Sequence, residues 1–270
     1  MKFDYYKFLW RQGPVEFSRG MPYSRCAEYP AVINELELAS DDRLLDVGSR
    51  YSPLPQILAL RFGCSVVAVD PESDFRDRQL KMAGKVSEAN DLVQQGRLDF
   101  LVEDASRLPF PDGSFSKISV ISVLEHIDEE APVVTELARV LAPGGRLVIS
   151  VPFDPWRDEP KYYRKRAYVT GSEKREDFYM RFYSKQNLLD RLVKPSGLAL
   201  RKSIYIGEPG FNAHNKLFGN ERIHWAIRRL FIQPFAPLAA SKLIRELEPD
   251  QFRHKTKMYT ADAAILVLTK

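Results

Sequence analysis

The chain has 270 residues, of which 44% are hydrophobic and 28% charged, and its formal net charge is only +4. This length fits one large α/β domain or a domain with an insertion, and no uncharged apolar run reaches the ~18 residues that a membrane-spanning helix requires. The two cysteines, Cys26 and Cys64, are not closely spaced, which argues against a disulfide framework or a metal–sulfur cluster. Together with the lack of a cleavable signal pattern, this predicts a cytoplasmic protein.

Residues 1–40 precede the first predicted strand and are expected to form an N-terminal helical segment. Within the stretch AEYPAVINELELA the apolar residues recur at helical spacing. Those that would share one face are Val32, Ile33, Leu36 and Leu38. We therefore predict that the main domain covers residues 41–270.

Short apolar runs rich in Val, Ile and Leu alternate with helical patterns in the main domain. The first five runs lie at 43–47, 65–69, 98–102, 116–122 and 146–151, and two more lie at 198–206 and 263–269. Such alternation is typical of βαβ units and a parallel sheet.

Proline and glycine mark the ends of the intervening helices. The helix after the first strand opens with Pro53 and Pro55 and is expected to end before Gly63, because proline is tolerated in a first turn and glycine at a helix end. Ser184 is the expected cap of a later helix, and Gly197 lies just past its end.

Acidic residues and a glycine follow three successive predicted strands. Asp46 and Gly48 lie at the end of the first strand, Asp70 at the second and Asp104 after the third. Ligands of parallel sheets bind beyond the carboxyl ends of the strands, and a glycine there lets a ligand approach the backbone. A dinucleotide fingerprint would need glycine at the position of Arg50, so a ligand without a pyrophosphate is favoured.

Carboxylates at these positions suit a nucleoside. Asp70 can accept hydrogen bonds from both ribose hydroxyls, and Asp104 can accept one from an exocyclic adenine amine. Taken singly, each is also compatible with a helix cap or a turn residue, as the Asp70-Pro71 pair illustrates.

The four motifs occur together in order: LLDVGS, VVAVDPE, EDASRLPFPDGSFSKISVISVLEHI and ELARVLAPGGRLVISVP. Over about residues 40–153 the chain resembles the class I S-adenosylmethionine-dependent methyltransferases, in the small-molecule group that includes quinone-biosynthesis C-methyltransferases. The resemblance implies an α/β fold with a Rossmann-like doubly wound sheet of seven strands. The sheet would be mostly parallel with an antiparallel final strand, accompanied by N-terminal helices and a helical insertion.

The resemblance also implies S-adenosylmethionine as cofactor and a set of residues that bind it. Methionine contacts fall to the first loop, ribose contacts to the second strand end, adenine contacts to the third, and the amino-acid end to the turn after strand four. The expected residues, in chain order, are Asp46, Gly48, Ser49, Asp70, Pro71, Asp104, Ala105 and Ser122. The chain departs from the family at Arg50, where a second glycine is usual. Either the loop takes a different turn or Arg50 points outward.

His126 is the candidate catalytic base because it follows strand four on the reacting edge. An equally compatible interpretation is that Glu125 and His126 merely begin the next helix. His214 and His224 lie in the insertion and are weaker candidates. No metal site is predicted, although Asp154 and Asp158 keep a metal-dependent reaction open.

The predicted reaction is methyl transfer to a small-molecule, sugar or lipid-like acceptor, at a hydroxyl oxygen. The alternatives are C-methylation of a quinone or polyketide-like ring, and a cofactor-binding or membrane-surface module with little turnover. Nucleic acid is not expected as a partner: the chain has Ser122-Val123-Leu124-Glu125 where base-amine methyltransferases carry an Asp/Asn-Pro-Pro-aromatic turn, and no long basic stripe is present.

Two segments are expected to face the acceptor: a cap at residues 154–183 and a helical insertion at 207–260. Between Phe211 and Lys257 the chain has nine basic and four acidic residues, a net charge of +5. An apolar helical stripe in the insertion consists of Ile223, Ala226, Ile227, Leu230 and Phe231. Pro234 and Pro237 interrupt it before a second short helix at 238–247. The region 219–248 is predicted to form a lid or dimer contact, a peripheral membrane contact, or a docking site for another partner.

Overall fold

A computed structural model of the protein describes residues 1–156, 161–163, 177–209, 213–218, 223–252 and 262–270. Its centre is an eight-stranded sheet with the order β3-β2-β1-β4-β5-β10-β8-β9. The strands are β1 (Arg43–Val47), β2 (Ser65–Asp70), β3 (Leu98–Val102), β4 (Phe115–Ile121), β5 (Leu141–Pro152), β8 (Ala199–Gly207), β9 (Arg245–Glu246) and β10 (Ala263–Thr269). A separate two-stranded sheet pairs β6 (Lys161–Tyr163) with β7 (Asp177–Met180).

The strand pairing confirms the predicted Rossmann-like α/β fold. β1 runs parallel to both β2 and β4, and the strand order reverses between them. β10 is antiparallel to β5 and to β8, as expected for the final strand. An eighth strand, the two-residue β9, joins the edge by pairing with the end of β8.

β5 begins five residues earlier than predicted. Leu141 already pairs with Phe115 of β4, and the pairing resumes at Arg146 with Lys117 after a register shift. The Pro143-Gly144-Gly145 turn is therefore a bulge within the strand rather than a spacer before it, because the pairing partner continues on both sides of it.

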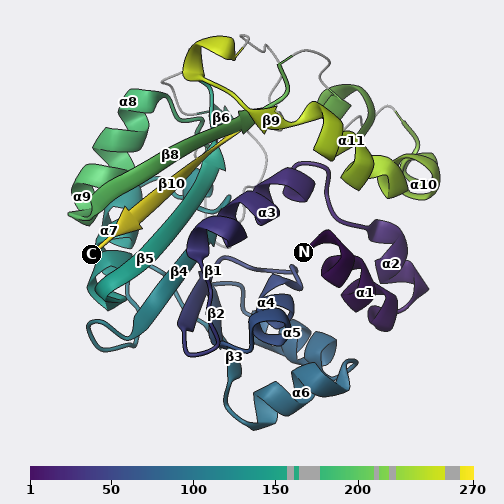
Figure 1. Ribbon diagram of the computed structural model, residues 1–270, viewed down its shortest axis with the longest axis horizontal. Coiled ribbons are helices and arrows are strands. Elements are labelled where there is room, and N and C mark those ends of the chain that lie inside the picture. Colours follow the sequence, from purple (N-terminus) through teal and green to yellow (C-terminus); the bar gives the residue numbers. More distant parts are fainter. Residues whose placement is uncertain (157–160, 164–176, 210–212, 219–222, 253–261) are drawn as a thin grey trace.

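Helices cover both faces of the sheet (Figure 1). The α-helices are α1 (Lys2–Gln12), α2 (Pro14–Arg19), α3 (Arg25–Leu36), α4 (Leu54–Phe62), α5 (Phe75–Ala83), α6 (Ser87–Gln94), α7 (Glu130–Val140), α8 (Lys185–Asn187), α9 (Lys194–Ser196), α10 (Trp225–Ile227) and α11 (Ala236–Leu243). A π-helical turn at Leu188–Val193 joins α8 to α9. Similarly, a π turn at Arg228–Ile232 and a 3₁₀ turn at Gln233–Phe235 join α10 to α11.

Each face of the sheet has its own hydrophobic core. One core packs alternate strand residues such as Leu44 and Val66 against the helices α1 and α3–α6. The other packs Leu45 and Val67 against α7 and the helix that follows Ser184. Burial on both faces explains why the strands read as nearly continuous apolar runs.

The predicted helix ends are confirmed. α4 ends at Gly63 and α9 at Gly197, and both glycines adopt the left-handed conformation with φ of +66°. The Ser184 hydroxyl caps α8 by accepting the Asn187 backbone N–H at 3.3 Å. These helix ends share one physical cause. Helix termini leave backbone N–H and C=O groups without partners inside the helix, and a polar cap or a left-handed glycine lets those groups form hydrogen bonds.

The N-terminal helices lie beside the helices of the insertion (Figure 1). Hydrogen bonds connect the two segments. The Arg229 guanidinium donates to Ser18 at 2.7 Å, and the Gln233 amide donates to the Met21 carbonyl at 2.6 Å. The predicted second helix at 238–247 is wrong at its end: α11 stops at Leu243, because Arg245–Glu246 pairs with β8 instead. Within the described residues, no helix has the length and apolar character needed to cross a bilayer.

Candidate functional site

Asp46, in β1, fastens the first loop to the neighbouring strand. Its carboxylate is almost fully buried, at 3% exposure. The hydroxyl of Ser49 in the loop donates to one oxygen and that of Ser119 in β4 donates to the other. Burial raises the pKa of Asp46 to about 6, against the lowering effect of the two hydroxyls.

Gly48 lies where this loop passes closest to the turn after β4. Its φ is +76°, and its N–H donates to the Val69 carbonyl at 2.8 Å. A Cβ atom at this position would lie 2.3 Å from Cγ2 of Val123. Glycine is therefore required here for two reasons, the left-handed backbone and the close approach of Val123.

The loop continues into Arg50, for which the sequence leaves two alternatives, a different turn or an outward-pointing side chain. Arg50 keeps the left-handed backbone that a glycine would favour, with φ of +43°. Its guanidinium lies 3.0 Å from the Glu72 carboxylate and stacks on the Tyr51 ring at 4.7 Å. The backbone at Arg50 is thus left-handed, and its partly buried side chain extends toward Glu72.

Asp70 receives two backbone N–H groups at the end of β2. The Arg50 N–H donates to one carboxylate oxygen at 3.0 Å and the Glu72 N–H to the other at 3.1 Å. Because each carboxylate oxygen has two acceptor sites, each keeps one for a further donor. Burial raises the pKa of Asp70. The free acceptor sites fit the two neighbouring hydroxyls of a ribose.

The third strand end lies next to the second. The Glu103 N–H donates to the Asp70 carbonyl at 3.2 Å. Asp104 is exposed and its side chain accepts the Ser106 N–H at 2.8 Å, whereas Ala105 is buried in the same core as Val69. Pro71, the remaining residue predicted here, is exposed beside Asp70.

Ser122, after β4, is held by two charged residues that sequence analysis missed. Its backbone is left-handed, with φ of +51°. Its hydroxyl accepts from the Arg25 guanidinium at 2.6 Å and donates to Glu28 at 2.9 Å. Arg25 and Glu28 also form an ion pair with each other, and Ser150 of β5 donates to the same Glu28 oxygen.

This cluster brings the N-terminal segment into the site. Arg25 and Glu28 lie in the first turn of α3, far in sequence from the strand ends. The sequence carries one signal: Glu28 precedes Val32 by four residues and so falls on the apolar face of the helix. In the structure it is 2% exposed. A carboxylate on a buried helix face needs a polar partner, here supplied by the ends of β4 and β5.

Glu125 and His126 do not begin the next helix. They lie in a separate 3₁₀ turn, Leu124–His126, whereas α7 starts at Glu130. Glu125 is 2% exposed, and its Oε2 atom has no hydrogen-bond partner among the described residues. Its Oε1 atom lies 3.9 Å from Nε2 of His126, whose side chain is 36% exposed. A buried carboxyl thus stands beside an accessible imidazole.

A buried ion-pair network supports this turn from behind. The Arg181 N–H donates to the Glu125 carbonyl at 2.8 Å, and its guanidinium pairs with Glu130. Glu130, 1% exposed, also accepts from Tyr183 at 2.7 Å and from Arg191 at 2.7 Å. Because the Glu125 backbone is held by this hydrogen bond, the backbone position of the neighbouring His126 is held as well.

The buried Glu125 predicts a pH dependence of folding stability. Burial raises its pKa to about 8, well above the ordinary glutamate value of about 4.3. The folded state therefore retains a proton that the unfolded state releases, so this group's contribution to stability is lost as pH rises through that window. Denaturant titrations between these pH values should show wild-type stability falling relative to Glu125→Gln, by up to about 1.4 kcal/mol per pH unit. Parallel curves for the two proteins would contradict the buried, protonated carboxyl.

Two of the remaining candidates, His224 and Asp154, have described side chains, and both make local hydrogen bonds. His224 is exposed, and its Nδ1 accepts the Ala226 N–H at 3.3 Å, as a helix cap does. The His214 side chain and Asp158 lie outside the described residues, and Asp154 accepts the Trp156 N–H at 3.1 Å. In the part of the chain that the structure describes, no three His, Cys, Asp or Glu residues gather as metal ligands.

The sequence matches one known protein family over part of its length. Residues 45–149 match the family described as a methyltransferase domain. An O-methyltransferase of Aspergillus nomiae is 31% identical over 126 residues, which are 43% of this chain and 55% of that protein. The demethylmenaquinone methyltransferase of Thermus thermophilus is 36% identical over 108 residues, 40% of this chain and 46% of that protein. The chain thus spans about half the length of these curated relatives.

Among solved structures, a geranyl diphosphate C-methyltransferase from Streptomyces coelicolor is similar in fold. The two superpose with a TM-score of 0.58 over 90% of this chain and 77% of the other, at 16% sequence identity. At that identity the likeness concerns the fold alone.

Proposed function

Because residues 45–149 form a class I S-adenosylmethionine-dependent methyltransferase domain, we propose that the protein methylates a hydroxyl oxygen of a small-molecule, sugar or lipid-like acceptor. The methyl donor of this domain is S-adenosylmethionine. The observation that carries the cofactor site in this proposal is the edge where the ends of β1, β2 and β4 meet. There Asp46 of β1 accepts from Ser119 of β4. The loop after β1 bonds to β2 through the Gly48 and Arg50 N–H groups.

The cofactor-binding residues in this proposal follow the strand ends. Asp70 accepts from the ribose hydroxyls, and its two free acceptor sites support this role. Asp104 and Ala105 adjoin the adenine, with Pro71 beside the ribose. The methionine end is assigned to Asp46, Gly48, Ser49 and Ser122. When bound, the cofactor supplies a methyl group on a sulfonium, an intrinsically good leaving group.

The protein's own task is then to align the acceptor, exclude water and take up its proton. Alignment of reacting groups contributes about 7–11 kcal/mol where the geometry is held. We assign the proton to His126, because its imidazole is accessible at the end of β4 and its turn is anchored by Glu125 and Arg181. A positioned base of this kind is worth roughly 10²–10⁴-fold in rate.

Replacing His126 with alanine tests this assignment. We expect turnover to fall by roughly 10²-fold or more, while the dissociation constant for S-adenosylhomocysteine stays within a factor of about 2, because the imidazole serves the acceptor and not the cofactor. The matched control is His224→Ala, which removes another exposed histidine outside this cluster. Turnover of His126→Ala equal to that of wild type would remove His126 from the mechanism.

C-methylation of a quinone or polyketide-like ring is the second candidate. Its support is the sequence similarity to demethylmenaquinone methyltransferase noted above. A general base suits either reaction, since a phenol-activated ring carbon also loses a proton. The two candidates differ in the bond formed, carbon–oxygen or carbon–carbon, and therefore in the chemistry of the product.

The proposed function is tested by incubating the protein with methyl-labelled S-adenosylmethionine and fractionated cell extract. Hydroiodic acid cleaves methyl ethers but leaves carbon-bound methyl groups in place. Label that appears in a small-molecule fraction and is released by the acid would support O-methylation, and retained label would support the ring carbon. Binding of S-adenosylhomocysteine without labelled product in any fraction would favour a cofactor-binding module instead.

A further inference from the structure

The helical run from α10 to α11 presents an uncovered apolar face. Five large side chains on it are each more than half exposed: Ile227 (51%), Leu230 (59%), Phe231 (68%), Phe235 (62%) and Leu238 (56%). Ile227, Leu230 and Phe231 belong to the predicted stripe, and Phe235 and Leu238 extend the exposed apolar side chains into α11. The predicted stripe is therefore not buried against the core within the described structure.

This face is held in place by the opposite side of the same run. Ala236 and Ala240 are fully buried, and Ile232 and Leu243 pack against the core. The Lys2 ammonium donates to the Pro237 carbonyl at 3.2 Å, in addition to the Arg229 and Gln233 contacts already described. The run is therefore apolar on both sides, and only one side is used for packing.

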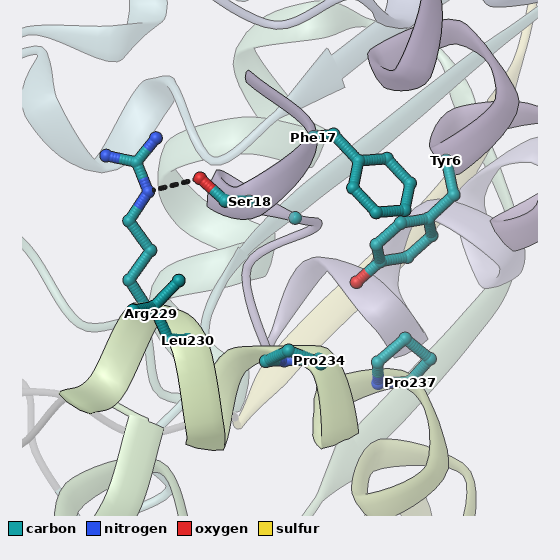
Figure 2. A pocket seen from close by; sticks show the side chains of 8 residues that line it. Tyr6, Phe17, Ser18, Arg229, Leu230, Pro234 and Pro237 are labelled. Carbon is teal, nitrogen blue, oxygen red and sulfur yellow. Dashed lines mark hydrogen bonds between the residues drawn. The ribbon is translucent and has the colours of Figure 1, made fainter. Parts of the chain in front are cut away.

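The uncovered face continues onto the N-terminal helices. Trp10 of α1, 69% exposed, packs edge-on against Phe17 of α2 with ring centroids 5.1 Å apart. Phe17 and Leu230 line the same cavity of about 450 Å³, with Tyr6, Pro234 and Pro237 (Figure 2). We call the docking surface the set Trp10, Phe17, Ile227, Leu230, Phe231, Phe235 and Leu238.

Charge around the docking surface has a single sign along the helical run. From Ile223 to Ile244 the chain contains Arg228, Arg229 and Lys242 and no Asp or Glu. Lys242 is exposed and follows Leu238 by four residues, so it extends the same face. Exposed apolar side chains bordered by cations complement an anionic lipid surface, where the former enter the acyl boundary and the latter meet phosphates.

A second copy of the chain fits this surface less well. In a two-fold dimer the same patch meets itself, so the cations of one copy would face those of the other. The run offers no acidic residue to pair with them, and Glu16 of α2, next to Phe17, is already paired with Arg19 at 2.9 Å. Like charges brought together at an interface oppose association.

We propose that the docking surface binds the protein peripherally to anionic lipid bilayers. The run from α10 to α11 lies in the plane of the membrane, with Phe231 and Phe235 in the headgroup–acyl boundary and Lys242 at the level of the phosphates. The surface shares no residue with the strand-end site, so binding to vesicles can be measured without methyl transfer.

Vesicle flotation of the full chain tests the proposal. Wild type should float with phosphatidylcholine vesicles that contain phosphatidylglycerol, and much less with phosphatidylcholine alone. The double variant Phe231→Ser, Phe235→Ser should lose at least about tenfold in affinity, and Lys242→Glu should weaken binding only to the anionic vesicles. Both sites are exposed, so folding should be retained, and circular dichroism verifies it.

The matched controls lie on other elements. Leu60→Ser removes an exposed apolar residue of α4, and Lys81→Glu reverses an exposed charge on α5; both should float like wild type. Wild type that stays unbound, or that floats equally after all substitutions, would overturn the proposal. Light scattering that shows a wild-type dimer, converted to monomer by the double phenylalanine variant, would assign the surface to a second copy instead.

Discussion

Gly48→Ala should destabilise the protein by about 2–5 kcal/mol. A left-handed backbone costs a residue with a Cβ about 1–2 kcal/mol, and crowding a packed site adds about 1–3 kcal/mol. Both apply here, because φ is +76° and the new Cβ would lie 2.3 Å from Val123. Urea denaturation measures the loss. Since the same loop carries the Arg50 N–H that donates to Asp70, affinity for S-adenosylhomocysteine should fall as well.

The chain offers a matched control for each part of this cost. Gly144 has a φ of +74°, but a Cβ there would meet no atom within 4 Å, so Gly144→Ala should show the backbone cost alone. Val123→Ala removes the two closest atoms and should recover part of the loss in the Gly48→Ala background. Equal destabilisation by both alanine substitutions would contradict the close approach of the loop to the β4 turn.

Asp70→Asn should weaken S-adenosylhomocysteine binding by roughly 10–100-fold. A hydrogen bond to a charged group is worth about 1.5–3 kcal/mol, and the substitution removes the charge and one acceptor atom. Its amide would also face a backbone N–H that now donates to the carboxylate, from Arg50 or from Glu72. Isothermal titration calorimetry gives the dissociation constants directly.

Asp99→Asn is the control for that measurement. Asp99 lies within β3 rather than at its end, and its exposed carboxylate pairs with Arg76 at 3.0 Å. Its loss should leave the dissociation constant unchanged within a factor of about 2, since an exposed ion pair contributes little. Equal affinity of Asp70→Asn and wild type would remove Asp70 from the ribose site.

The parts of the fold that sequence predicted are those in which local pattern and burial agree. Val66, Val67, Ala68 and Val69 form a continuous apolar run because both faces of β2 are covered. Gly63 and Gly197 mark helix ends through a backbone conformation that glycine adopts without strain. Such signals are carried by neighbouring residues alone, so no knowledge of the tertiary structure is needed.

Prediction failed where distant segments decide the outcome. The stretch after Leu243 has a helical pattern, yet Arg245 and Glu246 pair with the end of β8. The role of Arg25 and Glu28 depends on α3 lying across the ends of β4 and β5, whose Ser122 and Ser150 are 94 and 122 residues from Glu28. Likewise, the apolar pattern of the insertion does not reveal which side of the α10–α11 run packs against the core.

The candidate site shows the same division. The positions of Asp46, Gly48 and Asp70 at strand ends follow from the apolar runs before them, and the structure links them to neighbouring segments through Ser119, Val123 and the Arg50 N–H. Their role in cofactor binding stays a prediction. The buried state of Glu125 could not be inferred, because a polar residue after a strand is usually exposed. In the structure its carbonyl accepts the Arg181 N–H, and Arg181 pairs with Glu130, contacts between segments far apart in the sequence.

A crystal structure of the protein with S-adenosylhomocysteine is the most direct test of the strand-end site. We expect the ribose hydroxyls within hydrogen-bonding distance of the Asp70 carboxylate, the adenine beside Asp104 and Ala105, and the sulfur facing the turn that carries His126. Occupancy of another place, such as the cavity between α2 and the α10–α11 run, or an empty strand edge at saturating ligand, would contradict the account.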